Sequence, residues 1–201
     1  MKKIFFVLLG SLLLITGCGK EMPTENPIVT MTIKDYGDIV MELYPEVAYN
    51  TVANFVNLTQ EGFYDNNTMH RLVKGFVLQG GDPTATGTGG PGYNIKGEFV
   101  LNGVNNDLSH TKGIVSMARA EDYNSAGSQF FIVLEDSAKS SLDSRYAAFG
   151  KVIEGMDIIE QIANEDFEFT DSNGMLKTPL TIEKTVVDTK GFEYEVKKYK
   201  N

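Results

Sequence analysis

The sequence predicts a mainly β fold, a closed sheet of short strands capped by two α-helices. Three observations favour this class. Short segments of alternating apolar and polar residues recur along residues 29–187, and glycine-rich or polar turns separate them. Only residues 47–60 and 155–163 show the apolar spacing of helices. No internal repeat or domain boundary divides the chain, so we expect one domain over residues 29–201, built as a capped barrel.

The first elements are a hairpin and an amphipathic helix. Residues 29–34 and 38–43 alternate at period two around a turn that contains Gly37, which is typical of a β-hairpin. In the helix that follows, residues 47–60, an apolar face recurs at i, i+3, i+4 and i+7, and Gly62 stands just past its end. That face consists of Val52, Phe55, Val56 and Thr59.

The later elements are strands with one more helix between them. An extended stretch is expected to begin at Glu98-Phe99. The apolar face of the second helix is made by Met156, Ile158, Ile159 and Ile162. The further strands are expected at residues 113–118, 128–133, 147–152 and 180–187.

The segment from residue 69 to residue 82 carries the most unusual pattern. We interpret it as a strand, in which alternate side chains point to opposite faces. Gly75 permits a bulge or a bend, and a one-residue slip there would bring Phe76 onto the face of Arg71. That face would then combine a guanidinium, a carboxamide and apolar groups. Without the bulge it carries Arg71, Val73, Gly75, Val77 and Gln79, and the other face carries His70, Leu72, Phe76 and Leu78.

Several blocks in the same order resemble the cyclophilin family of peptidyl-prolyl cis-trans isomerases. Beside residues 69–82 they are residues 87–90, 116–120, 127–132 and 149–152, and the similarity runs from about Met31 to about Val187. The resemblance implies a closed eight-stranded antiparallel barrel with a helix at each mouth. It also implies an enzyme that turns the peptide bond before proline and needs no cofactor.

The resemblance assigns the catalytic role to Arg71, a charged residue among apolar neighbours in mid-strand. Phe76, Val77 and Phe131 would form the walls of a proline pocket. Gln79 and Gln129 would orient substrate carbonyls or Arg71 itself, and the backbone at Arg119 would pair with an extended peptide. The substrate-binding residues implied in this way are Phe76, Val77, Gln79, Ala118, Arg119, Ala120, Gln129, Phe131, Leu142 and Tyr146.

The sequence departs from the best-known family pattern at several positions. Lys74 stands where the family often has proline, and Arg119 replaces a common asparagine. Tyr146 replaces the histidine of animal members, and the loop of residues 121–126 is about one residue longer. Ser141, just before Leu142-Asp143, stands where cyclosporin-sensitive members carry tryptophan, so we expect weak or no cyclosporin binding.

Other site chemistries have weak support in the sequence. The glycines of residues 87–90 are not followed by Gly-Lys-Ser/Thr, so a surface loop is a better interpretation than a phosphate site. His70 and His110 lack Cys, Asp or Glu at ligand spacing, so we expect no metal and a structural role for His70. No Gly-x-Ser-x-Gly motif marks a nucleophile, and Ser128 is expected only to begin a strand.

The amino terminus has the pattern of a bacterial lipoprotein signal. Lys2-Lys3 precedes a short apolar segment, too short for an ordinary membrane span, that ends in Ile15-Thr16-Gly17-Cys18. This end resembles a lipobox, so residues 1–17 would be removed and Cys18 lipidated; a plain secretory signal is the alternative. Residues 18–28 are expected to form a flexible tether. Cys18 is the only cysteine, so no internal disulfide can form.

The charge of the chain limits its partners. The net charge is −9, and removal of residues 1–17 would take away Lys2 and Lys3 but no acidic residue, which makes it −11. A strongly acidic protein is a poor ligand for nucleic acid or anionic lipid headgroups. From the amino-terminal signal and the family resemblance, we expect a monomer that is anchored to the extracytoplasmic face of the cell membrane through Cys18 and acts on proline-containing polypeptides.

Two other functions are alternatives to isomerisation. A binding module or holdase would recognise proline segments without turnover. A lipoprotein that binds small solutes is less consistent with the sequence, because the apolar residues predict a filled barrel. Catalysis on exported proteins is favoured, since uncatalysed X–Pro isomerisation takes tens to hundreds of seconds.

Overall fold

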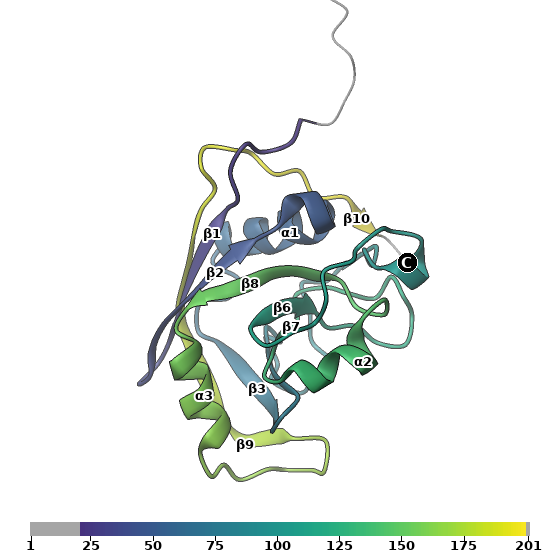
Figure 1. Cartoon of the computed structure of the whole chain (residues 1–201). Helices are drawn as coiled ribbons and strands as arrows, with labels where there is room; N and C mark the ends of the chain where they lie inside the picture. The colour runs from purple at the N-terminus through teal and green to yellow at the C-terminus, as the bar shows by residue number, and fades with distance from the viewer. Residues whose placement is uncertain (1–20, 200–201) are drawn as a thin grey trace, which may run out of the picture.

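The computed structural model describes residues 21–199 and contains a closed antiparallel barrel (Figure 1). Its strands are β1 (Ile28–Ile33), β2 (Gly37–Leu43), β3 (Asn67–Val73), β4 (Val77–Gly80), β6 (Ile114–Met117), β7 (Phe130–Val133), β8 (Ala148–Glu154) and β9 (Met175–Asp188). Their order around the barrel is β1-β2-β8-β6-β7-β4-β3-β9. The eight-stranded antiparallel barrel predicted from the sequence is therefore confirmed. Two short strands, β5 (Asn94–Ile95) and β10 (Lys198–Tyr199), pair with each other outside it.

The predicted amino-terminal features lie almost entirely outside the described residues. This applies to the signal peptide (residues 1–17), to Cys18 and to the tether up to residue 20. At the other end of the tether, Asn26 hydrogen-bonds to Glu42 and the Pro27 carbonyl accepts the amide of Leu43. The packed domain thus begins slightly before residue 29. Among residues 21–199, no helix is long and apolar enough to cross a membrane.

Both predicted helices are present, and the structure adds a third. α1 (Pro45–Gln60) and α3 (Met156–Asn164) lie toward opposite ends of the barrel (Figure 1). The prediction of two helices missed α2 (Lys139–Leu142), which continues from the 3₁₀ turn η2 (Asp136–Ala138). A helix of one turn is too short to show an apolar period, so no pattern along the chain indicated it.

The segment from residue 69 to residue 82 is a hairpin and not one strand. β3 ends at Val73, the chain turns through residues 74–76, and β4 returns beside it. Gly75 has a φ of +72° and lies in the turn, so of the two predicted alternatives at Gly75, a bulge or a bend, the bend is the one that forms. The register instead shifts at His70, between Met69 and Arg71. As a result Arg71 lies directly opposite Gln79.

The stretch that begins at Glu98-Phe99 does not continue as a strand. It enters the 3₁₀ turn η1 (Val100–Asn102) instead. Glu98 has a structural role, because its carboxylate accepts the amides of Asn50 at 3.1 Å and Thr51 at 2.7 Å. Those amides need an outside acceptor because Ala48 is non-helical and interrupts α1. The carboxylate thereby caps the main part of the helix.

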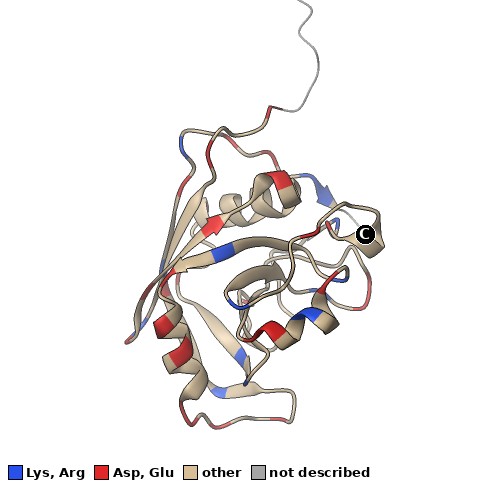
Figure 2. Ribbon diagram, viewed as in Figure 1, with Lys and Arg blue, Asp and Glu red and all other residues tan. Residues whose placement is uncertain are grey.

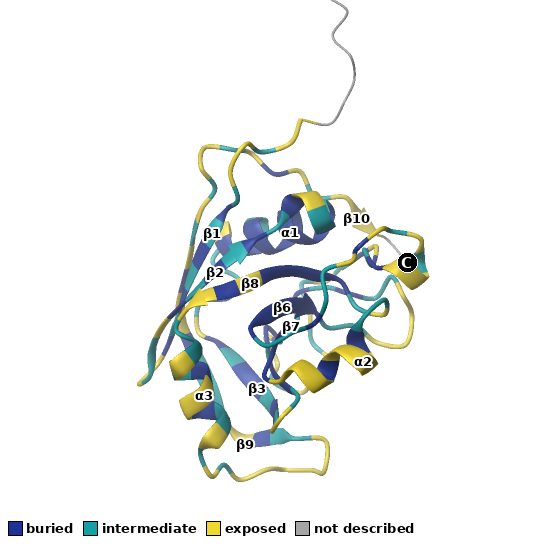
Figure 3. Cartoon of the chain, viewed as in Figure 1, coloured by how far each residue is buried: buried dark blue, intermediate teal, exposed yellow. Residues whose placement is uncertain are grey.

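Buried apolar side chains form two clusters, which the alternation of side chains along the strands of a closed barrel places inside and outside it. Figure 3 shows the buried segments of the chain in dark blue. In the inner cluster Phe55 from α1 contacts the rings of Tyr64, Phe130 and Phe149. Full burial of each such side chain contributes about 1.5–3 kcal/mol. Side chains alternate along β7, so Phe130 is in the inner cluster and Phe131 in the outer one. The outer cluster supports the site described next.

Candidate active site

Three polar side chains form a hydrogen-bonded row across neighbouring strands. Arg71 is on β3, Gln79 is on β4, and Gln129 immediately precedes β7. Arg71 Nη1 donates to Gln79 Oε1 at 2.9 Å, and Gln79 Nε2 donates to Gln129 Oε1 at 2.9 Å. The row is partly exposed to solvent. The arrangement connects the three polar residues expected at the site, and we call it the Arg71 row.

The guanidinium of Arg71 is fixed at two of its three nitrogens. Besides the bond to Gln79, Nε donates to the carbonyl of Asn173 at 2.8 Å. Among residues 21–199, Nη2 has no acceptor and no carboxylate forms an ion pair with Arg71. Burial lowers the pKa of Arg71, while Asp171 and Tyr146 act in the opposite direction. An arginine remains protonated at neutral pH, so the row presents a fixed cation with a donor left over.

A glycine-rich loop fixes the other end of the row. Gln129 Nε2 donates to the carbonyls of Gly87 at 3.0 Å and Gly89 at 2.9 Å. The loop is in turn wound around Asp82, whose carboxylate accepts the amides of both glycines and of Thr84. Burial opposes ionisation of Asp82, but these N–H bonds prevail and hold its pKa below the usual range. Residues 87–90 were expected only as a surface loop, and this role was not foreseen.

One loop position requires glycine. A Cβ added to Gly89 would lie 1.9 Å from Oδ1 of Asp82, far inside van der Waals contact. The carboxylate can therefore bind the loop only if residue 89 lacks a side chain. This explains the glycine without any phosphate ligand.

The predicted apolar wall lies next to the Arg71 row. Phe131 pairs directly with Gln79 across β4 and β7, so the ring and the carboxamide are neighbours. The ring of Tyr146 meets that of Phe131 edge-on, with 5.7 Å between their centroids. Val77, Phe131 and Leu142 are buried, whereas Phe76, Ala118 and Tyr146 are partly exposed at the edge of the outer cluster.

Arg119 is held by aromatic rings. Its guanidinium carbon lies 5.2 Å from the ring centroid of Phe99, 4.9 Å from that of Tyr123 and 4.8 Å from that of Tyr146. Its N–H groups donate to three backbone carbonyls, which leaves the side chain in a structural position. Within residues 21–199, its backbone amide and carbonyl make no hydrogen bond. The backbone role predicted for Arg119 is compatible with this geometry.

A groove of about 910 Å³ is lined in part by Gln79 and Gln129 of the Arg71 row. Gln79, Ala118, Arg119, Ala120 and Gln129 line both regions, so the groove and the predicted site are continuous. The rest of the lining was not anticipated from the sequence. It includes the loop of residues 87–93 and, from β10, Lys198 and Tyr199.

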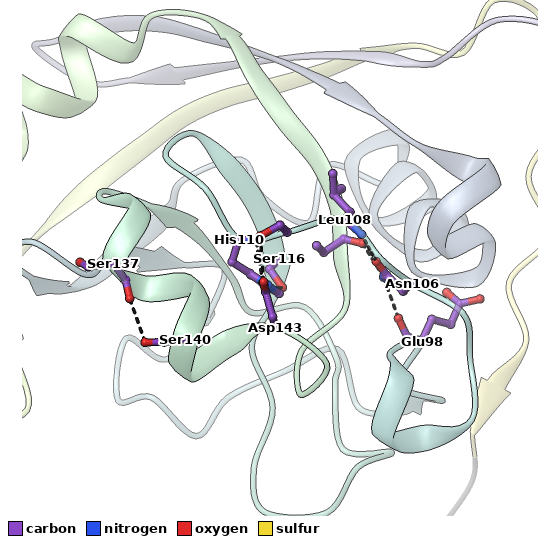
Figure 4. A network of polar contacts seen from close by, with 10 residues as sticks. Glu98, Asn106, Leu108, His110, Ser116, Ser137, Ser140 and Asp143 are labelled. Atoms are coloured by element: carbon purple, nitrogen blue, oxygen red, sulfur yellow. Dashed lines mark hydrogen bonds and ion pairs between the residues drawn. The ribbon is translucent and has the colours of Figure 1, made fainter.

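A second polar array, made by His110, Ser116 and Asp143, is shown in Figure 4. The ring of His110 stacks on that of Phe131, with 6.1 Å between the ring centroids. His110 Nε2 is 2.9 Å from Ser116 Oγ, and His110 Nδ1 is 2.9 Å from Asp143 Oδ1. We call it the His110 array. Although it resembles a nucleophilic triad, Ser116 is 0% exposed and no substrate can reach its hydroxyl. Burial lowers the pKa of His110 despite the neighbouring Asp143, so the ring is neutral and structural.

His70 is also a core residue, as expected. It is fully buried, and neither ring nitrogen has a hydrogen-bond partner among the described residues. Burial lowers its pKa, which keeps the ring neutral. Within residues 21–199, no three His, Cys, Asp or Glu side chains are placed so that they could hold a metal ion.

Similarity to known proteins identifies the class. Residues 28–187 match the family described as cyclophilin type peptidyl-prolyl cis-trans isomerase/CLD. The chain belongs to this family, whose members include the enzymes that isomerise the peptide bond before proline. It is a peptidyl-prolyl cis-trans isomerase.

Individual relatives support this assignment over most of their length. Peptidyl-prolyl cis-trans isomerase B of Bacillus subtilis is 47% identical over 134 residues, which cover 67% of this chain and 89% of the relative. A cyclophilin type peptidyl-prolyl cis-trans isomerase of Cryptosporidium parvum has a similar structure, with a TM-score of 0.71 and 31% identity over 81% of this chain and 98% of that one. A second structure of it, in the presence of the dipeptide Ala-Pro, gives a TM-score of 0.70 and 32% identity over 80% and 98% of the two chains.

Proposed function

We propose that this enzyme isomerises X–Pro bonds of exported proteins at the membrane surface, and that Arg71 and the adjoining apolar wall bind the twisted amide. The observation that carries the proposal is the geometry of Arg71. Its guanidinium is oriented by Gln79 and Asn173 and keeps Nη2 free of any acceptor in the described part of the chain. A cation so placed can act on a substrate without giving up a bond to the protein.

The reaction requires little more than such a site. Rotation about a peptide bond meets a barrier of about 18–20 kcal/mol because amide resonance is lost. No bond is made or broken, so the enzyme has only to bind the twisted amide more tightly than the planar one. As resonance is lost, the prolyl nitrogen becomes pyramidal and gains a lone pair that accepts a hydrogen bond. The N–H of Arg71 Nη2 is the donor that we assign to it.

In this proposal the apolar wall binds the proline ring, and the glutamines orient Arg71 and the substrate. Phe131, Phe76 and Val77 would grip the pyrrolidine ring while the preceding carbonyl swings around the bond. Gln79 and Gln129 hold Arg71 in place through the row, and the second N–H of Gln79 Nε2 can orient a substrate carbonyl. A hydrogen bond to a charged donor contributes about 1.5–3 kcal/mol, so desolvation in the pocket must supply part of the remainder. The structure of the similar isomerase in the presence of Ala-Pro is consistent with this occupant.

A protease-coupled assay on an X–Pro peptide tests the role of Arg71. Loss of one charge-assisted hydrogen bond in the transition state predicts that Arg71→Ala lowers kcat/KM by about 10- to 150-fold. The matched control is Arg145→Ala, since Arg145 is exposed and its side chain makes no hydrogen bond or ion pair within residues 21–199. Both variants should unfold at the temperature of the wild type. Equal turnover by Arg71→Ala and wild type would remove Arg71 from the mechanism.

The membrane location rests on the amino-terminal sequence. Lys2-Lys3, the short apolar segment and the Ile15-Thr16-Gly17-Cys18 end support lipidation of Cys18. Each buried CH₂ of an acyl chain contributes about 0.8 kcal/mol, and stable anchoring requires more than one chain. Cell fractionation tests the proposal, since Cys18→Ser should move the protein from the membrane fraction to the soluble exported fraction. An unchanged distribution would contradict anchoring through Cys18.

A further inference from the structure

The carboxy-terminal strand forms a wall of the groove. Lys198 and Tyr199 of β10 line it together with Gln129 and the loop of residues 87–93. The family match ends at residue 187, so this wall is built by a segment outside the part of the chain that matches the family. The proline site and the wall belong to the same groove, and a peptide that passes Gln129 enters it.

The wall is held firmly in place. β10 pairs antiparallel with β5, with Lys198 opposite Ile95. One residue earlier, the side chain of Asn50 from α1 bonds both the amide of Lys197 at 2.7 Å and its carbonyl at 3.1 Å. Further back, the buried ring of Tyr194 packs on Phe192 at 4.9 Å between centroids. These contacts make β10 part of the folded domain (Figure 1).

The groove is positively charged in an acidic protein. Its lining residues include Arg119 and Lys198 but no aspartate or glutamate, although the chain as a whole carries a net charge of −9. The guanidinium of Arg119 already donates hydrogen bonds to three backbone carbonyls. Lys198 Nζ lies 4.1 Å from the ring centroid of Tyr93 and has no hydrogen bond or ion pair within residues 21–199. Lys198 is exposed, and the ribbon of β10 carries the blue of basic residues in Figure 2.

We propose that Lys198 determines substrate specificity by binding a carboxylate side chain of the polypeptide that lies in the groove. The enzyme then favours X–Pro bonds that have an aspartate or glutamate within a few residues of the proline. Tyr93 keeps the ammonium in place from one side, through a cation–π contact. The other side of the ammonium remains available to the substrate. This proposal rests on the proposed function, because it assumes that X–Pro peptides bind across Gln129.

The experiment measures kcat/KM for paired peptides in which glutamate or glutamine occupies each position in turn on either side of the proline. The expected result for wild type is a glutamate-to-glutamine ratio of roughly two to five at one position, the range for a partly exposed ion pair. The ratio should decline toward one as salt is added. In Lys198→Gln it should be about one at all positions, and in Lys198→Glu it should fall below one.

Lys197→Gln is the matched control. It removes one positive charge from the neighbouring position, but the side chain of Lys197 does not line the groove and Asn50 contacts only its backbone. It should keep the ratio of the wild type. A ratio near one in wild type, or an equal ratio in wild type and Lys198→Gln, would overturn the role of Lys198. Failure of wild type to turn over any X–Pro peptide would instead contradict the proposed function itself.

Discussion

The Arg71 row and the His110 array lie on two sides of Phe131. They differ in how many of their polar atoms have a hydrogen-bond partner within the protein. In the His110 array both ring nitrogens have partners, and Ser116 is fully buried. In the Arg71 row the side chains are partly exposed, and Arg71 Nη2 has no acceptor among residues 21–199. The array that resembles a catalytic triad, the His110 array, is thus the one that a substrate cannot reach.

The difference shows why side-chain identity alone does not define a site. A buried array in which every polar atom has a hydrogen-bond partner stabilises the fold. Breaking any of these hydrogen bonds would leave a buried polar atom unpaired. An oriented donor without a protein acceptor, at the edge of an apolar wall, is available to a ligand. This difference supports the proposal that the Arg71 row acts on the substrate, whereas the His110 array supports Phe131.

The largest effect that separates the two arrays is expected from Ser116→Ala. This change leaves buried His110 Nε2 without its partner, which should lower the free energy of unfolding by about 1–3 kcal/mol. kcat/KM of the folded enzyme should stay within about twofold, because no step uses Ser116. Urea unfolding and the coupled assay, below the unfolding transition, measure the two quantities.

Ser140→Ala is the control for this experiment. The Ser140 hydroxyl bonds the Ser137 carbonyl at an exposed position (Figure 4), so its loss should change the free energy of unfolding by less than about 0.5 kcal/mol. If Ser116→Ala abolished turnover but kept stability, the roles of the two arrays would have to be exchanged.

A smaller effect is expected from pH. Burial holds the folded-state pKa of His70 and His110 below that of the unfolded chain, which is about 6.5. The unfolded chain therefore takes up more protons as the pH falls below about 6.5. The free energy of unfolding should be constant just above that pH and decrease below it. The lowered pKa values of Asp82 and Asp143 affect the free energy of unfolding only at lower pH, below about 4.

In contrast to the free energy of unfolding, kcat/KM should not fall as the pH is lowered, because Arg71 stays charged and the glutamines do not titrate. Unfolding curves and kcat/KM for an uncharged peptide, both between about pH 5 and pH 8, provide the comparison. Stability that rises toward pH 5 would contradict the assignment of neutral, buried histidines.

The barrel was predictable because its pattern is local and repeated. Alternation along β1 and β2, the turn at Gly37 and the apolar face of α1 all appear in short windows of sequence. The residues expected at the site also come together, with Arg71, Gln79 and Gln129 in one row. Their catalytic and binding roles remain predictions.

What the sequence did not reveal depends on long-range contacts. His110 and Asp143 are 33 residues apart and share no motif, so their pairing could not be seen in advance. The pairing of β10 with β5 involves two residues on each side, too few to show alternation. The sequence left open whether Gly75 makes a bulge or a bend, because glycine is compatible with both.

The most direct test of the central claim separates binding from turnover in one sample. Exchange NMR on an X–Pro peptide reports the rate of cis–trans interconversion on the enzyme, and titration of the same sample gives Kd. We predict that Arg71→Ala lowers the exchange rate by at least about tenfold while Kd changes by less than about threefold, since Arg71 acts on the twisted amide. An unchanged exchange rate, or a Kd that weakens as much as the exchange rate falls, would contradict the account.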